Sequence, residues 1–356
     1  MSSLFTIKHQ SQWKGSSKCH DSRAQNLGMR NRLSRLPDCK PYPDDKFPVR
    51  APVILQHLQS RDYSFTNQWG FQAGKSTSLA LLSTIHDWHL HLENSTEVCA
   101  TFLDLRKAFD SVPLRQLMEV LSNLGLPSSV LKWLVSYLTD RKQRVVVNGC
   151  TSVPMKVLSS LVFPCRVRFL GLSYFCCSYI NSIQDLKLSA GTRMMLYADD
   201  ILLYKPIHSM TDYQQYQSDI NTVSIWLKHR HLSINPAKCK YMVVTRKRFS
   251  LMQTFPPILI ESTPIDQVSE MKYLGVTITS DLSLSKHISK ISSKARKVAG
   301  LVYRKFYKHL ATPALLKLYL STVRPILEYC SSVWDPHLIK DIVLLERVQR
   351  FALRIS

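Results

Sequence analysis

Acidic residues are scarce in this sequence. Among 356 residues, 25 are Asp or Glu and 47 are Lys or Arg, so the formal net charge is +22 and the pI is near 9.7. The basic excess is spread along most of the chain instead of being confined to a tail. A diffuse positive surface favours a polyanionic partner, with nucleic acid ahead of an anionic membrane. A basic protein without such a partner is the plain alternative.

Paired cysteines, a secretory signal and a membrane-length apolar run are also missing. The nine cysteines form no C-x-x-C pair, which argues against a zinc ribbon and against a disulfide framework. Residues 1–14 contain no apolar core followed by a cleavage site. The most apolar window, 169–183, is shorter than a bilayer span. We therefore expect an intracellular protein, nuclear or cytoplasmic, that is neither secreted nor embedded in a membrane.

The remaining pattern divides the chain into a leader and a folded α+β region. Residues 1–52 are polar, basic and rich in proline towards their end, and no helical or strand period persists there. Beyond residue 53, apolar spacing predicts both helices and strands. The predicted helices cover 78–92, 114–124, 128–138 and 211–229, and the predicted strands cover 98–105, 241–245 and 272–278. From residue 284 onward the pattern is helical and strongly basic.

A glycine-punctuated turn at 67–77 invites comparison with a phosphate loop. The pattern Gly-x-x-x-Gly-Lys-Ser is one residue too short, because Trp69 stands where the first glycine is needed. No predicted strand leads into the turn either. We reject an ATPase site here, although a basic turn before a helix could still contact phosphate.

Two adjacent acids, Asp199 and Asp200, interrupt an apolar segment. Short runs of strand-forming residues flank them, so the pair is predicted to lie at the turn of a β-hairpin. Neighbouring carboxylates repel one another unless a cation neutralises them. A third acid, Asp104, lies at the end of the predicted strand 98–105, one residue before its last position. An ordinary polar turn is the competing interpretation of the pair.

The three acids converge if both strands lie side by side in one sheet. Three carboxylates at adjacent strand ends can hold two Mg²⁺ ions about 4 Å apart, a layout used for phosphoryl transfer. A basic surface would hold a nucleic-acid substrate beside them. The residues alone thus predict a metal-dependent nucleotidyl transferase or a two-metal nuclease.

The motifs taken together resemble the reverse transcriptase of non-LTR (LINE-type) retrotransposons. The matching stretches, in the order of that family, are 102–110, 197–200, 235–240 and 272–276. Residues 67–77 look like its fingers motif, and residues 318–336 look like the segment after its palm. The resemblance covers about residues 55–356 and favours a polymerase over a nuclease.

The resemblance implies an α+β right-hand polymerase with fingers, a palm built on an antiparallel sheet, and a helical thumb. Fingers and palm would occupy 53–280, after a loose basic leader at 1–52. Residues 281–356 would form the thumb and the start of a C-terminal region. The implied partners are an RNA template, a DNA primer and deoxynucleoside triphosphates, and the implied cofactors are two Mg²⁺ ions, with Mn²⁺ as a possible substitute. The oligomeric state stays open.

The resemblance also assigns roles to single residues. Asp104, Asp199 and Asp200 would be the catalytic metal ligands. Phe109 matches the aromatic residue that screens the 2′ position of the incoming sugar, although a core phenylalanine would fit the same place. Lys238 matches a lysine that assists departure of pyrophosphate, with a solvated turn lysine as the alternative. Asp110 is expected to cap the following helix. The basic residues of 286–308 would line the nucleic-acid side of the thumb, or form a solvated helix face.

Residues 161–178 depart from the family pattern. The family has a glycine-rich turn resembling GVPQGSVLGPLLF before a Tyr-Ile-Asn stretch, and only that stretch is present, at 179–181. With suitable synonymous codons, Cys165 to Cys177 read in a shifted frame translate as QGSVLGPILFLL. We therefore infer a pair of compensating frameshifts, or a gene-model error, which the coding nucleotide sequence would test.

The departure limits the expected activity. Glycines in the missing turn would let the nascent base pair approach the backbone closely, and Arg166, Arg168 and Phe169 stand there instead. We expect a reverse transcriptase whose polymerase activity is severely impaired. The alternative is a catalytically inactive remnant of the same element that binds nucleic acid through its positive charge.

Overall fold

The computed structural model describes residues 34–37, 65–106, 108–139, 142–147, 150–156, 178–307 and 309–353. The predicted leader, apart from 34–37, and the segment 161–177 therefore lie outside the described residues.

Helices are spread along the whole described chain. They are α2 (Thr77–Glu93), α3 (Ala108–Ser111), α4 (Leu114–Asn123), α5 (Ser128–Leu138), α7 (Met210–His229), α8 (Ser285–Phe306), α9 (Thr312–Thr322), α10 (Arg324–Glu328), α11 (Ser331–Trp334) and α12 (Ile339–Leu353). The four helices predicted between residues 78 and 229 are confirmed, and each of their ends lies within one residue of the prediction.

Strands alternate with these helices up to residue 279. They are β1 (Ser34–Pro37), β2 (Glu97–Leu103), β3 (Lys142–Val147), β4 (Cys150–Thr151), β5 (Met155–Lys156), β6 (Arg193–Tyr197), β7 (Asp200–Ile207), β8 (Lys240–Val244), β9 (Leu259–Ile260), β10 (Thr263–Pro264), β11 (Asp266–Gln267), β12 (Glu270–Tyr273) and β13 (Val276–Thr279).

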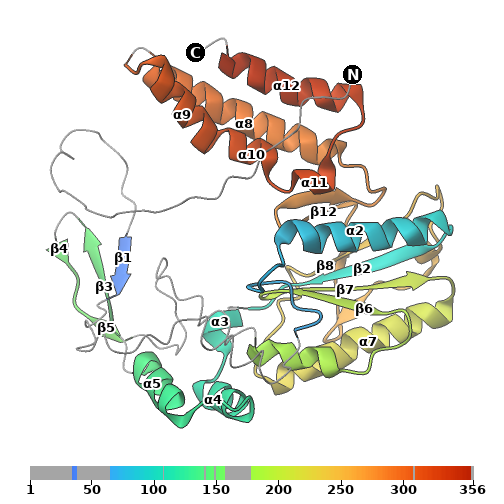
Figure 1. Cartoon of the computed structure of the whole chain (residues 1–356). Helices are drawn as coiled ribbons and strands as arrows, with labels where there is room; N and C mark the ends of the chain where they lie inside the picture. The colour runs from blue at the N-terminus through green and yellow to red at the C-terminus, as the bar shows by residue number, and fades with distance from the viewer. Residues whose placement is uncertain are drawn as a thin grey trace.

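A five-stranded sheet lies at the centre of the molecule, in the order β11-β8-β2-β7-β6 (Figure 1). Strand β2 pairs antiparallel with β7 on one side and with β8 on the other, and β6 and β7 form a hairpin. The sheet is antiparallel as predicted, except that the short edge strand β11 runs parallel to β8.

The middle strand β2 is buried on both faces. Every one of its residues is buried, because α2 covers one face of the sheet and α7 covers the other (Figure 1). Val98 and Phe102 belong to the core that includes α2, whereas Cys99 and Leu103 belong to the core that includes α7. This alternation follows from the two-residue period of a strand.

Both covering helices begin at side-chain caps. The Ser76 side chain accepts the Leu79 N–H at the start of α2. Helix α7 has a capping box, in which Ser209 and Asp212 each accept a backbone N–H of the other. Such caps satisfy the first free donors of a helix, which is why these helices start where they do.

The segment predicted as one strand over 272–278 is a hairpin. Strands β12 and β13 pair with Tyr273 opposite Val276, so Leu274 and Gly275 form a two-residue turn. Both turn residues have positive φ, 44° and 87°. Positive φ at both positions is typical of a hairpin turn and incompatible with a continuous strand, so the single-strand prediction was wrong.

A smaller sheet lies at the periphery. Strand β3 pairs with β1, β4 and β5. Val147 of β3 lies opposite Cys150 of β4. Residues 148 and 149 lie outside the described part of the chain.

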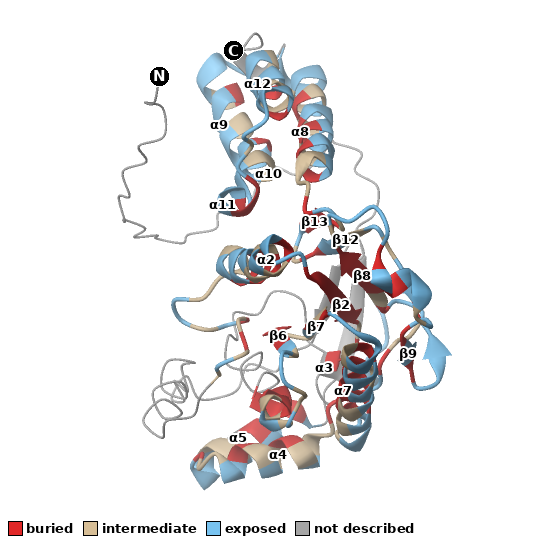
Figure 2. Cartoon of the chain, turned by 90° about the vertical axis from the view of Figure 1, so that its right-hand side faces the viewer, coloured by how far each residue is buried: buried red, intermediate tan, exposed pale blue. Residues whose placement is uncertain are grey.

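Helices α8 to α12 form a layer beyond the β12–β13 hairpin (Figure 1). Their core is small and consists of Ala295, Ala299, Val323 and Val348, with partly buried neighbours. Figure 2 shows that most residues of these helices are exposed. No helix in the described ranges is both long enough and apolar enough to cross a membrane.

Candidate active site

The register of the central sheet brings the three predicted acids together. Leu103, the last residue of β2, lies opposite Ile201 of β7, so Asp104 leaves the sheet beside Asp200. Tyr197 pairs with Asp200, which leaves Ala198 and Asp199 as the turn of the β6–β7 hairpin. The condition that the two strands lie side by side is met. The predicted hairpin is confirmed, but Asp200 is the first residue of β7 and only Asp199 of the two acids lies in the turn.

The hairpin turn contains a residue in the left-handed conformation that is not a glycine. Ala198 has φ 57°, a conformation that costs a residue with a Cβ roughly 1–2 kcal/mol. Two-residue hairpin turns need positive φ to match the twist of their strands. Contacts around the turn therefore have to stabilise it.

Residues after α7 hold Asp104 from the other side. The Asp104 carbonyl accepts the Asn235 N–H at 2.8 Å, and the Asp104 N–H donates to the Cys239 Sγ at 3.3 Å. The Arg106 N–H donates to the Ser233 carbonyl at 2.8 Å. The backbone of Asp104 is thus fixed between β7 and the 233–239 loop.

The same loop brings Lys238 to the acids. Its Nζ lies 3.9 Å from the Asp104 Oδ2, and the lysine side chain is 69% exposed. An exposed pair at this distance contributes little to stability. The lysine remains free to contact a bound anion.

The pKa values of Asp199 and Asp200 are raised by their surroundings. Desolvation by the surrounding protein and then the negative charges of Asp199 and Asp104 raise the pKa of Asp200 to about 6. The pKa of Asp199 is raised as well, by the same desolvation first and by the Asp104 charge. Within the described residues, the ion pairs include Asp104 but neither Asp199 nor Asp200. Positive charge would relieve the repulsion between these carboxylates.

The donor set suits a hard divalent cation. Carboxylate oxygens are the ligands that Mg²⁺ and Mn²⁺ prefer, and the three acids reach solvent. Among the described residues, no group of three His, Cys, Asp or Glu side chains is already gathered tightly enough to hold an ion. Sharing one would require the three side chains to turn towards one another. The residues present therefore fit a metal by chemistry and by backbone placement.

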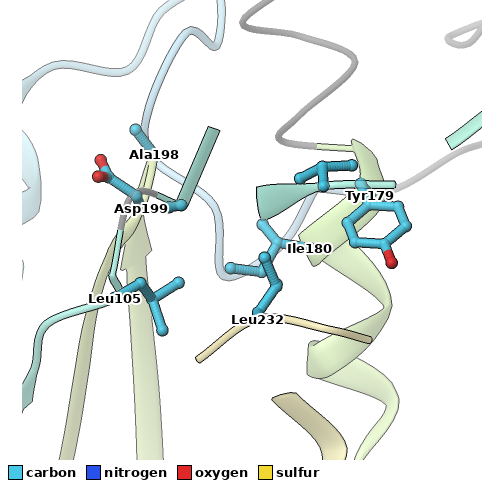
Figure 3. Close-up of a pocket in the computed structure, with 8 residues that line it drawn as sticks. Leu105, Tyr179, Ile180, Ala198, Asp199 and Leu232 are labelled. Atoms are coloured by element: carbon cyan, nitrogen blue, oxygen red, sulfur yellow. The ribbon is translucent and has the colours of Figure 1, made fainter. Parts of the chain in front are cut away.

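A hollow open to solvent lies beside Asp199 and is lined by Ala108 of α3. Its empty space, part of which is open solvent, is about 270 Å³. Figure 3 shows Asp199 and Leu105 at one end and Tyr179 at the other, with Ile180 and Leu232 between them. Tyr179 is fixed there, because its hydroxyl contacts the Gln116 side chain and the Arg230 carbonyl. The hollow places apolar side chains beside Asp199. Two of its lining residues, Tyr179 and Ile180, follow shortly after residues 157–177, which lie outside the described part of the chain.

Two predicted residues lie in the short helix α3. Phe109 and Asp110 lie in the short helix α3, five and six positions after Asp104, and their side chains lie outside the described residues. The predicted screening role of Phe109 and the capping role of Asp110 therefore stay predictions.

The basic residues of α8 face solvent. They are Lys286, Lys290, Lys294, Arg296, Lys297, Arg304 and Lys305, and all are exposed. Lys286 and Lys290 form ion pairs with Glu270 of β12. At least part of this charge therefore links α8 to the β12–β13 hairpin.

Sequence reasoning missed the residues that support the acids. Gln68 is fully buried, and its side chain contacts the backbone of Ala198. Asn235 and Cys239 hold the Asp104 backbone. The motif matches at 67–77 and 235–240 pointed to these stretches, but nothing in their spacing showed which side chains would face the acids.

Comparison with known proteins identifies the class. Residues 51–278 match the family model described as reverse transcriptase (RNA-dependent DNA polymerase). The match covers more than half of the chain, and the chain belongs to this family. Its α+β fold is the right-hand polymerase fold, and its curated relatives place it with the LINE-type, non-LTR members.

The relatives are transposon polymerases. One is the probable RNA-directed DNA polymerase from transposon X-element of Drosophila melanogaster, 27% identical over 84% of this chain and 33% of the relative. Another is the RNA-directed DNA polymerase from mobile element jockey of Drosophila funebris, 26% identical over 80% and 31%. A telomerase structure from Candida albicans with a telomeric RNA fragment aligns at 13% identity and TM-score 0.48, over 86% and 56%. The chain spans about a third of the length of these transposon relatives.

Proposed function

We propose that Asp104, Asp199 and Asp200 form the metal site of an RNA-directed DNA polymerase. The observation that carries the proposal is the β2–β7 register, which sets Asp104 beside Asp200 with Asp199 in the adjoining turn. Bound Mg²⁺ or Mn²⁺ would activate the primer hydroxyl and neutralise charge on the triphosphate. An RNA template, a DNA primer and deoxynucleoside triphosphates are the proposed partners.

Two further residues have proposed roles in this reaction. Lys238 extends an exposed ammonium group beside Asp104, where it can donate a proton or a hydrogen bond to departing pyrophosphate. Phe109 follows Asp104 in α3 and would exclude a 2′-hydroxyl from the sugar site. The three carboxylates would hold the metal ions that bind the triphosphate, and the loop at 233–239 keeps the Asp104 backbone in place.

We further propose that the altered segment 161–178 severely impairs polymerisation. Primer extension by the purified full chain on an RNA template with Mg²⁺ tests this proposal. Extension is expected to be very weak, and Asp199→Ala is expected to abolish whatever remains. Robust extension by the unaltered chain would overturn the impairment.

Restoring the family motif sharpens that test. A chain in which Cys165 to Cys177 is replaced by QGSVLGPILFLL is expected to extend the primer far better than the original chain, and only while Asp199 is intact. A restored chain that stays inactive, although folded, would favour the second candidate.

The second candidate function is nucleic-acid binding without catalysis. The observations that favour it are the net charge of +22 and the departure of 161–178 from the family pattern. Salt-dependent binding cannot separate the two, because both functions predict it. Asp199-dependent incorporation of a deoxynucleotide separates them.

A further inference from the structure

The outer edge of the β6–β7 hairpin is covered by a segment that lies far away in sequence. Strand β6 is an edge strand of the central sheet. The Leu196 N–H donates to the Asn67 carbonyl at 2.9 Å, and the Trp69 N–H donates to the Leu196 carbonyl at 2.8 Å. Residues 67–69 therefore pair with the edge as a single parallel bridge, Gln68 to Leu196.

After Leu196, the next residue whose backbone N–H and C=O face the outer edge of the sheet is Ala198. Leu196 turns its N–H and C=O to the outer edge, and residues two apart in a strand point the same way. The Ala198 N–H donates to the Gln68 Oε1 at 2.9 Å, and the Gln68 Nε2 lies 3.4 Å from the Ala198 carbonyl. The side-chain amide of Gln68 thus takes the place of a peptide group and continues the ladder by one more step.

The backbone of the covering segment must leave the edge at this point. A Cβ at Gly70 would lie 2.6 Å from the Ala198 nitrogen, closer than real contacts allow. The Gly70 N–H also donates to the Gln68 Oε1, at 2.8 Å. A glycine at 70 therefore lets the chain pass the turn and aims the Gln68 side chain at it.

Lys75 fixes the covering segment from behind. Its ammonium donates to the carbonyls of Phe65, Thr66 and Gln68 at 2.9, 3.2 and 2.9 Å. It also lies 5.1 Å from the Trp69 ring centre, and burial lowers its pKa. The ammonium is therefore directed into its own loop.

We propose that Gln68 is a positioning residue for the metal site: its amide holds Ala198 in the left-handed conformation that keeps the backbones of Asp199 and Asp200 beside Asp104. The inference rests on the proposed function, because it assigns Gln68 a role through the carboxylates. A fully buried side chain that accepts the N–H and donates to the C=O of Ala198 holds the two peptide groups on either side of that residue. The second of these peptide groups joins Ala198 to Asp199, so Gln68 fixes the backbone from which the Asp199 side chain extends.

A matched pair of variants tests the proposal on the full chain. Gln68→Met keeps the size of the side chain and removes both polar contacts. Gln217→Met is the control, because Gln217 makes the same two contacts with the Leu259 backbone, at 2.9 and 2.8 Å, outside the acid group. Gln68→Ala, which leaves room for water at the same backbone groups, serves if the methionine variant does not fold.

The first measurement is amide exchange by NMR on chain labelled with ¹⁵N-alanine and ¹⁵N-leucine, without metal. Gln68→Met is expected to speed exchange of the Ala198 amide at least tenfold and to leave the Leu259 amide unchanged. Gln217→Met is expected to do the reverse. An Ala198 amide that exchanges equally fast with and without Gln68 would overturn the proposal.

The second measurement is Mn²⁺ affinity by electron paramagnetic resonance. Gln68→Met is expected to weaken Mn²⁺ binding roughly tenfold, the lower end of what partners of metal ligands contribute, and Gln217→Met less than twofold. Equal affinity in Gln68→Met and the original chain would overturn the positioning role alone. If the original chain bound no Mn²⁺ that Asp199→Asn removes, the proposed function would fail, and the positioning role with it.

Discussion

Two hairpins of this molecule have two-residue turns with positive φ, and different residues adopt that conformation in each. The β12–β13 turn has Leu274 and Gly275, both with positive φ, and the second position is the glycine that such turns favour. The β6–β7 turn has Ala198 and Asp199 instead, and only Ala198 has positive φ. An alanine thus occupies the position that a glycine would fill most easily, and a residue proposed as a metal ligand follows it in the turn.

Distant side chains hold both turns, but through different chemistry. The Tyr329 hydroxyl donates to the Leu274 carbonyl at 2.9 Å from an exposed position. Gln68 contacts Ala198 from a fully buried one. A hydrogen bond is worth more where water cannot replace it. The difference teaches that the turn carrying the acids relies on its partner side chain, whereas the other turn relies mainly on its glycine.

The largest expected effect on stability comes from His287, whose side chain contacts the backbone of β13. The Thr277 N–H donates to the Nδ1 of His287, which is 2% exposed. Burial, with Lys290 and Lys272 nearby, lowers the pKa of His287 to about 4. As pH falls, His287 is therefore protonated in the unfolded chain before it is protonated in the folded chain. The contribution of the neutral, buried His287 to the free energy of unfolding is intact above about pH 6.5 and is lost as pH falls towards 4. The total loss is on the order of 3 kcal/mol.

His287→Gln is expected to remove this pH dependence. Urea unfolding at several pH values between 4 and 7.5 measures the difference between the two chains, in which the titration of other groups cancels. Parallel stability curves for the two chains would contradict the assignment to His287.

The next effect tests the glycine of the β12–β13 turn. Gly275→Ala is expected to destabilise the chain by about 2 kcal/mol, because it combines positive φ with overpacking. The added Cβ would lie 2.8 Å from the Tyr329 Cε1. Gly74→Ala is the control, since Gly74 has φ +75° and open space around it. Thermal unfolding should show a clearly smaller loss for Gly74→Ala, and equal losses would mean that Tyr329 yields without cost.

A smaller effect is expected at the tyrosine. Tyr329→Phe removes the hydrogen bond to Leu274 and keeps the ring on Gly275. A loss of about 0.5 kcal/mol is expected, the low end for a hydrogen bond, because water can reach the Leu274 carbonyl. Urea unfolding measures it. A loss above about 2 kcal/mol would show that the hydroxyl, and not the glycine, carries this turn.

The smallest effect is at the other turn. Ala198→Gly removes the left-handed strain but gives the unfolded chain more freedom, so a net gain of up to about 0.5 kcal/mol is expected. Ala73→Gly in an exposed turn lacks positive φ and is expected to lose stability instead. Thermal unfolding compares the two, and a loss for both would contradict the strain at Ala198.

The sequence predicted the elements whose periodicity is strong. Helices α2, α4, α5 and α7 and the strand leading to Asp104 were placed within two residues, because their apolar spacing is regular. The meeting of Asp104 with Asp200 also followed, since strand-end acids converge when their strands pair. The hairpin at 270–279 was missed, because Lys-Tyr-Leu-Gly-Val has the composition of a strand and its turn depends on backbone conformation.

The support of the site could not be predicted for a different reason. Gln68 and Ala198 are 130 residues apart, and no local pattern records which side chain covers which strand edge. The same holds for Cys239 beside Asp104, where the contact joins residues 135 apart. Local composition can nominate metal ligands, whereas the groups that orient them come from tertiary packing.

A titration with Mn²⁺ tests the central claim most directly. Electron paramagnetic resonance on the full chain would be compared with Asp199→Asn and with Asp266→Asn, whose carboxylate is exposed and paired with Lys240 outside the site. Saturable binding is predicted in the original chain and in Asp266→Asn, weakened more than about 100-fold by Asp199→Asn, because partners of ligands alone carry up to that much. Equal binding in all three chains would contradict a metal site at Asp104, Asp199 and Asp200.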